Sequence, residues 1–450
     1  MATEATHEPT QAVAVIGGAV AGAQLARMLA DAGLEVVVFE QNARPFGKIE
    51  DGLPRWHAGL RNKEFERIVE RLSHPNIHLV PLTRIGRDVA FDDLSRVWGF
   101  TAVVLACGAW RDRSLPVAGI DAYVDKGLVY QNPFIIAFNH AEDPNYAGPT
   151  YPAVDDAIVV GGGLASIDVV KLLMLETTRQ ALAKRGHEID VESLEKAGMD
   201  KACEGFGLTW EELGLKGSTL YYRREPEDMP LQEAPEDADA ERVEKVRANR
   251  KKMLERTMAK YKFRFEALAA PEAPVVEGDH LVGLVFRRMG KDASGKLVKT
   301  DETFERRGNL VVSSIGSIPD PIKGVPMKGE LFAFTDWELG RLPDHPTVFS
   351  VGNVVTGKGN IVASRRHATN VGEQLLASYL GLAEDGHTAE AELAEGVEKI
   401  AGHVDSISEA VRKLGALPEG RLAEIRQRAR ARQVEVGFES DVATWIKRAR

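Results

Sequence analysis

Two stretches of the chain place apolar, glycine and polar residues in the same order. In residues 11–40, a β-branched run precedes a glycine-rich turn, and apolar residues then recur at helical spacing as far as Gly33. A second apolar run at 36–39 follows and ends at Glu40. The pattern predicts a strand, a helix and a second strand, which together form a βαβ unit.

Residues 155–176 repeat the strand, the glycine turn and the helix, but the next β-type run comes only at 218–222. About forty extra residues lie in between, and we expect helices over 191–215. The pattern at 278–303 predicts a hairpin, and the chain from about 375 to its end is expected to be helical. One type of strand–turn–helix unit is therefore used twice.

The composition is typical of a globular protein. Of 450 residues, 44% are hydrophobic and 28% are charged, and 57 Lys and Arg stand against 67 Asp and Glu, for a net charge of −10. This length predicts two or three domains. No apolar run is long enough for a membrane span, the N-terminus does not resemble a signal or transit peptide, and the acidic balance argues against nucleic-acid binding. We therefore expect a cytoplasmic protein with neither a membrane span nor a nucleic-acid partner.

Two residue classes limit the chemistry further. The two cysteines, Cys107 and Cys203, are too far apart for a CxxC pair and too few for a four-cysteine iron–sulfur cluster, and we expect no metal site. Residues 241–264 and 411–450 are rich in Lys and Arg. Each is either a solvated helix face or a docking patch for an acidic partner, and the sequence leaves both interpretations open.

A glycine turn between a strand and a helix suits a dinucleotide for physical reasons. The first glycine makes the tight turn, the second lets the backbone approach a pyrophosphate, the third lets helix and strand pack closely, and the helix N-terminus supplies N–H groups. Glu40 is placed to accept hydrogen bonds from a ribose, with a solvated carboxylate as the alternative. Alanine takes the place of the second glycine, since the turn reads Gly17, Gly18, Ala19, Val20, Ala21 and Gly22.

The second unit ends its next strand with the opposite charge. Arg223 and Arg224 stand where an acid would favour the free 2′-hydroxyl of NAD(H), and two guanidinium groups favour a 2′-phosphate instead. We therefore expect NADP(H) as the second nucleotide, with solvated loop arginines as the alternative. The residues expected to bind it at the turn are Gly161, Gly163, Leu164, Ala165 and Ser166, the last at the third glycine position.

Further motifs occur in a fixed order within residues 11–380. They are Pro45-Phe46-Gly47 with Gly52 and His57, Ala106-Cys107-Gly108, Asn132-Pro133-Phe134, the run from Tyr222 to Met229-Pro230, Ser313-Ser314-Ile315-Gly316, and Val351-Gly352-Asn353 with Gly357–Ile361. In this order they resemble the FAD/NADPH reductases with two dinucleotide-binding folds, among them adrenodoxin reductase and the glutamate synthase small subunit. The resemblance implies FAD as the first nucleotide.

The resemblance also implies roles for single residues. His57 is expected near the flavin and the nicotinamide as the candidate catalytic residue, where it tunes the site or contacts the partner; a structural or surface histidine is the alternative. Two positions depart from the motifs, because Arg55-Trp56 replace Pro-Asp and Asn353 replaces an aspartate that binds the ribityl chain. Besides the first turn and Glu40, the residues implied to contact FAD are Gly47, Cys107, Gly108, Gly352, Asn353, Gly359, Asn360 and Ile361.

We expect an α/β fold with two Rossmann-like dinucleotide-binding domains and a helical C-terminal extension. The FAD domain is expected to comprise residues 10–114 and 318–385, with an NADPH domain at 115–317 inserted and the extension at 386–450.

The implied activity is hydride transfer from NADPH to FAD, followed by electron transfer to a ferredoxin-like one-electron carrier. Three alternatives stay open: an electron-input subunit of a larger enzyme, a flavin oxidase or monooxygenase acting on a small molecule, and a non-catalytic nucleotide-binding protein. The sequence does not determine the oligomeric state.

Overall fold

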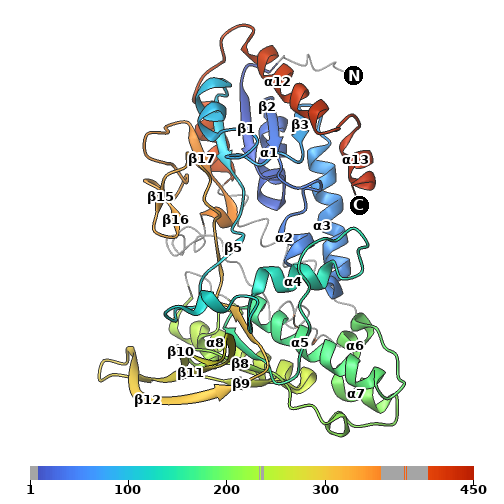
Figure 1. Ribbon diagram of the computed structural model, residues 1–450. Coiled ribbons are helices and arrows are strands. Elements are labelled where there is room, and N and C mark those ends of the chain that lie inside the picture. Colours follow the sequence, from blue (N-terminus) through green and yellow to red (C-terminus); the bar gives the residue numbers. More distant parts are fainter. Residues whose placement is uncertain are drawn as a thin grey trace.

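The computed structural model describes residues 9–232, 234, 238–355, 380, 382 and 404–449. The fold is α/β, and its two five-stranded sheets are both parallel, as predicted (Figure 1).

The first sheet joins strands from two distant parts of the chain. Its order is β17-β4-β1-β2-β3, so that β17, which begins near residue 350, pairs with a strand near residue 100. The register aligns Ala12 with Glu35 and Val13 with Ala102. Its strands are β1 (Ala12–Ile16), β2 (Glu35–Phe39), β3 (Ile77–Val80), β4 (Ala102–Leu105) and β17 (Val348–Ser350).

Helices and loops cover both faces of this sheet, which explains why its strands are apolar at nearly every position; Glu35, His78 and Ser350 are the exceptions. One face of β1, with Val13 and Val15, packs on α1 (Val20–Asp31), α3 (Ala58–Leu72) and the helical residues 404–412. The other face packs on the π-helical turn η2 (Asp93–Val97), residues 325–334 and α12 (Arg421–Glu435). The remaining elements here are α2 (Lys48–Asp51), α13 (Val442–Arg448), η6 (Gly352–Val354), β15 (Met327–Lys328) and β16 (Leu331–Phe332).

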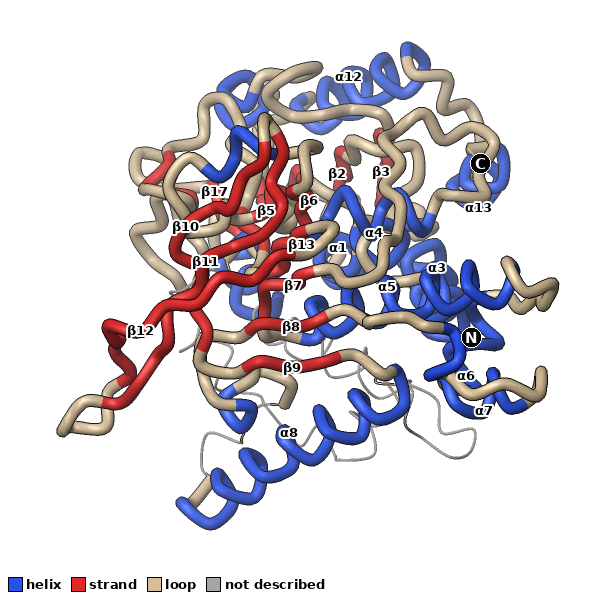
Figure 2. Tube along the Cα trace, turned by 60° about the horizontal axis from the view of Figure 1, so that its bottom comes forward, coloured by secondary structure: helices blue, strands red, loops and turns tan. Residues whose placement is uncertain are grey.

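The second parallel sheet has the order β6-β13-β7-β8-β9. It lies between a layer of helices and a three-stranded antiparallel sheet, residues 269–307 (Figure 2). Helices α4, α5 and α8 form one core with it, and β11 closes the other side with Leu281, Leu284 and Phe286. Its strands are β6 (Leu128–Tyr130), β7 (Ile158–Gly161), β8 (Thr219–Tyr221), β9 (Arg264–Glu266) and β13 (Val311–Ser314), and its helices are α4 (Gln131–Asn139), α5 (Leu164–Ala183), α6 (Val191–Ala197), α7 (Met199–Glu204) and α8 (Ala240–Tyr261).

The predicted insertion and hairpin are confirmed. α6, α7 and the 3-10 turn η4 (Glu211–Leu213) lie within 191–215, and β11 (His280–Lys291) pairs antiparallel with β12 (Leu297–Arg307), next to β10 (Ala269–Glu277). Short elements join the two sheets, since β5 (Arg111–Asp112) pairs with β14 (Ser317–Ile318) where the chain crosses in each direction. The other 3-10 turns are η1 (Arg55–His57), η3 (Ile120–Tyr123) and η5 (Pro226–Asp228).

The expected helical character of the C-terminal segment is confirmed for the described residues, which form separate helices at 404–412, in α12 and in α13. Breaks separate residues 404–412 from α12 and α12 from α13, because Gly420 and Gly437 have positive φ angles that end helical geometry and Pro418 lacks an N–H.

The arginines of α12 bind the body of the protein, which neither interpretation of the basic 411–450 segment foresaw. Arg426 donates to both carboxylate oxygens of Glu35 at 2.6 and 2.9 Å, and Arg432 donates from Nε to Thr83 Oγ1 at 3.0 Å. The basic helix is therefore bonded to the start of β2 and to the loop that follows β3. Among the described residues, no helix has the length and apolar character needed to cross a membrane.

Candidate dinucleotide-binding sites

A cavity of about 290 Å³ lies at the carboxyl ends of β1, β2 and β4. Ligands of open α/β sheets bind at this edge. The sequence-predicted residues that line it are Gly17, Ala19, Ala21, Glu40, Gly47, Cys107, Gly108, Gly352 and Asn353. The fold therefore brings residues from four separate motifs to one place.

Close backbone packing explains the glycines of the first turn. A Cβ on Gly17 would lie 2.6 Å from the carbonyl oxygen of Ala106, and one on Gly22 would lie 1.8 Å from the oxygen of Gly17. Gly18 lies beneath Glu40 and donates its N–H to that residue. Ala19 has extended backbone angles open to any residue, and its methyl group faces Gly47, where a Cβ would be only 2.8 Å away.

The Glu40 carboxylate is held in a fixed orientation by two backbone N–H groups. Its side chain is 5% exposed, Oε2 accepts the Gly18 N–H at 2.9 Å, and Oε1 accepts the Asn42 N–H at 2.9 Å. Burial raises the pKa of Glu40 above its ordinary value, against these backbone hydrogen bonds. Each carboxylate oxygen keeps a second lone pair, which suits a ribose hydroxyl.

Cys107 follows β4 at the cavity wall. Burial raises the pKa of its thiol to about 12, so that the side chain is a neutral thiol at physiological pH. Cys203 is buried on α7, in the core of the other sheet.

Sequence reasoning missed a polar group at the crossing strands. Lys48 Nζ donates to Asn132 Oδ1 at 3.2 Å and to Ser317 Oγ at 3.0 Å, and it lies 5.7 Å from the centre of the Trp110 ring. Burial lowers the pKa of Lys48 and raises the pKa of nearby Asp112 to about 6. Lys48 and Trp110 both line the cavity. Their hydrogen bonds to Asn132 and Ser317 therefore connect the cavity wall to the two segments in which the chain passes between the sheets. In sequence, a single lysine after a turn looks like any solvated lysine.

The second glycine turn joins β7 to α5. A Cβ on Gly161 would lie 2.5 Å from the oxygen of Ser314, and Gly163 caps the helix. Ser166, at the third glycine position, donates from Oγ to the Gly163 oxygen at 2.6 Å. Leu164 and Ala165 form the first turn of α5, in which no acidic side chain opposes an anion among the described residues.

Arg223 and Arg224 are exposed and directly follow Tyr222, at the carboxyl end of β8. Since β7 and β8 are parallel neighbours, the arginines and the glycine turn share one edge of the sheet. The loop after them is held in place, because Tyr222 donates its hydroxyl to the Asp228 oxygen at 2.9 Å and Arg250 donates to the Glu227 oxygen at 3.1 Å.

His57 lies between the two sheets rather than in the cavity. It belongs to η1, its side chain is 8% exposed, and its Nε2 lies 3.8 Å from Oδ1 of Asp168 on α5. Asp168 was not singled out from the sequence, because a single acid on an apolar helix carries no signal. Gly359, Asn360 and Ile361 lie outside the described residues.

No family model matches the chain. It is 33% identical over 161 residues to the glutamate synthase [NADPH] small chain of Bacillus subtilis, covering 35% of this chain and 31% of that one. It is 21% identical over 394 residues to the mitochondrial NADPH:adrenodoxin oxidoreductase of Arabidopsis thaliana, covering 78% of each.

The coverage is uneven across the curated relatives. The chain spans about a third of the Bacillus protein and 7% of the glutamate synthase [NADH] of Schizosaccharomyces pombe. Among solved structures, FprA from Mycobacterium tuberculosis in complex with NADPH has a TM-score of 0.61 at 19% identity, covering 95% of this chain and 91% of that one. At this identity the likeness concerns the fold. The comparisons confirm the resemblance predicted from the motifs: the chain is similar to proteins named glutamate synthase small chain and NADPH:adrenodoxin oxidoreductase.

Proposed function

We propose that the protein is an FAD-dependent NADPH oxidoreductase that passes electrons to a ferredoxin-like one-electron carrier. One observation carries this: two glycine turns stand at the carboxyl ends of two parallel sheets, one beside a buried glutamate and the other beside two exposed arginines. A carboxylate that accepts hydrogen bonds from a ribose marks a site for FAD, whereas arginines that donate to a 2′-phosphate mark a site for NADP(H).

The first site fits FAD. Gly17 and Gly47 let the segments that line the cavity pack more closely than a Cβ would allow, the N-terminus of α1 offers backbone N–H groups to a pyrophosphate, and Glu40 offers carboxylate oxygens to a ribose. The residues assigned to FAD are those predicted from the sequence, including Gly359, Asn360 and Ile361. We assign the FAD domain to 10–114 and 318–385, the NADPH domain to 115–317 and the C-terminal extension to 386–450.

The second site fits NADP(H). Gly161, Gly163 and the first turn of α5 are assigned to the pyrophosphate, and Arg223 and Arg224 to the 2′-phosphate, where guanidinium forks form charge-assisted hydrogen bonds. The exposure of the arginines suits a nucleotide that enters and leaves at each turnover.

The bound cofactors supply hydride chemistry and release of electrons in single steps. The chain's own residues position the rings and exclude water. Lys48 ties the wall of the first site to the crossing strands, and His57 faces Asp168 across the junction of the two sheets. We assign His57 as a positioning residue of this junction.

The acceptor is proposed from charge. The relatives include proteins named NADPH:adrenodoxin oxidoreductase, and α8 exposes Lys245, Lys251 and Lys252. An acidic one-electron carrier matches such a surface and is steered to it by long-range attraction. This proposal predicts that carrier reduction slows as ionic strength rises.

An anaerobic titration of the purified protein with NADPH and then NADH, followed by flavin absorbance, tests the core of the proposal. Bleaching by near-stoichiometric NADPH, with NADH much poorer, supports the reductase. Absence of flavin, or flavin that neither nucleotide bleaches, overturns it. A ferredoxin added after reduction then tests the acceptor separately.

A second candidate rests on the relatives named glutamate synthase small chain. In it the chain delivers electrons from NADPH to a larger partner. Recovery of a stoichiometric large subunit with the tagged chain, together with slow ferredoxin reduction, would favour this function over the first.

A further inference from the structure

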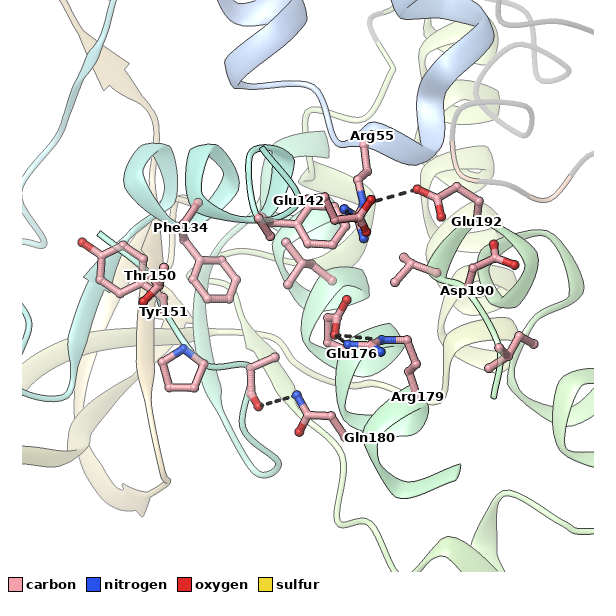
Figure 3. A pocket seen from close by; sticks show the side chains of 18 of the residues that line it. Arg55, Phe134, Glu142, Thr150, Tyr151, Glu176, Arg179, Gln180, Asp190 and Glu192 are labelled. Carbon is pink, nitrogen blue, oxygen red and sulfur yellow. Dashed lines mark hydrogen bonds and ion pairs between the residues drawn. The ribbon is translucent and has the colours of Figure 1, made fainter. Parts of the chain in front are cut away.

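A second and larger cavity, of about 710 Å³, lies on the helical side of the second sheet (Figure 3). It is bounded by α4, the segment 141–153, the middle of α5, and residues 188–192 that lead into α6. Among the described residues it shares no lining side chain with the 290 Å³ cavity, and no sequence-predicted nucleotide contact lines it. Its volume lies within the range of sites for small organic molecules.

The lining combines an apolar wall with an excess of acids. Phe134, Phe138, Leu172 and Val191 supply the apolar part. Arg55 and Arg179 are the lining cations, and the lining carboxylates are Glu142, Glu176, Glu188, Asp190 and Glu192.

Both arginines already pair with acids, as Figure 3 shows. Arg55 lies 2.8 Å from Glu142 and 3.3 Å from Glu192, and Arg179 lies 2.8 Å from Glu176. Each arginine is paired with at least one carboxylate, and more carboxylates than arginines line the cavity, so the net charge of its lining is negative. A ligand that adds positive charge relieves this surplus, whereas an anion increases it.

Much of the wall comes from segments outside the two glycine turns. Arg55 stands at a position where the sequence departs from the reductase motif, and its guanidinium lies 4.7 Å from the centre of the Phe138 ring. Residues 188–192 belong to the long insertion between α5 and β8. The cavity therefore joins the middle of α5 to segments outside the two glycine turns.

We propose that this cavity binds a small organic cation with an apolar body, such as an arylalkyl amine. The ammonium group binds the carboxylates beside Arg55, and the aromatic body packs on Phe134 and Phe138. This site is distinct from both proposed cofactor sites, and its test needs neither NADPH nor flavin reduction.

Calorimetry on the purified full-length protein with its cofactor bound measures this directly at pH 7. Three probes of the same shape are compared: 3-phenylpropylamine, 3-phenylpropan-1-ol and 3-phenylpropionate. We expect the amine to bind at least tenfold more tightly than the alcohol, and the carboxylate to bind more weakly than either. Equal affinity of the amine and the alcohol, or no amine binding at millimolar concentration, would overturn the proposal.

Variants locate the binding. Val191→Trp fills the cavity and Glu192→Gln removes one carboxylate, and we expect the first to abolish amine binding and the second to weaken it severalfold. Glu255→Gln, the same change on the exposed face of α8, is the matched control and should bind like the parent. Ala153→Trp fills the cavity from a loop and replaces Val191→Trp if that variant does not fold. Unchanged amine affinity in a folded cavity-filling variant contradicts the assignment.

Discussion

The two βαβ units share a turn but differ at two points that decide what each can hold. In the first unit the residue at the strand end, Glu40, is buried and fixed by two backbone N–H groups. In the second, Arg223 and Arg224 are exposed beyond the strand end. A buried, pre-oriented acceptor suits a resident cofactor, whereas exposed charges suit a nucleotide that exchanges with solvent.

The third glycine position shows the same division. Gly22 packs so closely on Gly17 that no side chain fits, but the matching Ser166 fits and bonds to the turn it follows. The first helix therefore lies tighter on its turn than the second. The comparison teaches that glycine is required only where two backbone segments are in direct contact, and not at every glycine position of the motif.

The largest expected effect comes from breaking this tight contact. Gly22→Ala places a methyl group against the Gly17 carbonyl, and the forced backbone shift costs about 1–3 kcal/mol of stability. We expect the protein to purify without flavin. Gly33→Ala, in the same unit, has open space around its Cβ position and strains only the positive φ of 84°, so it should lose about 1–2 kcal/mol and retain flavin. Flavin content and thermal unfolding distinguish the two, and full flavin in Gly22→Ala would contradict the packing argument.

The next effect removes the charge of the second unit. In the double variant Arg223→Ala with Arg224→Ala, two charge-assisted contacts are lost, and kcat/KM for NADPH should fall about 100-fold while NADH is barely affected. Arg412→Ala, an exposed arginine on the other sheet's side, serves as control. Equal losses with NADPH and NADH would mean that these arginines do not read the 2′-phosphate.

A smaller effect concerns Glu40, whose removal should act in opposite directions on binding and on stability. Glu40→Gln keeps the shape but leaves one acceptor oxygen and turns the other into an NH2 donor, so we expect flavin affinity to fall about tenfold.

The stability change follows from the raised pKa of Glu40. Burial raises it above its unfolded value, so the folded state binds the proton more tightly, and stability falls as pH rises from the unfolded pKa through the folded one. The glutamine variant lacks this loss. The flavin-free variant should therefore unfold at a higher temperature than flavin-free parent at pH 8, with the difference vanishing towards pH 4. A difference independent of pH would assign the effect to something other than this carboxyl group.

Much of this arrangement could be predicted from the sequence, and the reasons for the exceptions are physical. Local periodicity is enough to predict both βαβ units, the strand at 218–222 and the hairpin at 278–303. Each of these elements is specified by the order of residues within its own segment. Lys48, Asp112 and Asp168 could not be found, because their roles arise from the crossing of segments more than sixty residues apart. Arg426 likewise bonds to Glu35 across almost the whole chain, so its segment reads as a solvated basic helix.

The smallest expected effect exchanges the second position of the two turns. Ala19 and Gly163 both have extended backbone angles, so neither residue is required for conformation. Only the methyl group differs, and it stands where a pyrophosphate approaches. Ala19→Gly should therefore tighten flavin binding less than tenfold, and Gly163→Ala should raise the NADPH KM by a similar factor without changing kcat. Flavin dissociation and steady-state kinetics measure the two. If Ala19→Gly instead weakens flavin binding, the methyl group packs on the cofactor, and its contact with the Gly47 side of the cavity is part of the site.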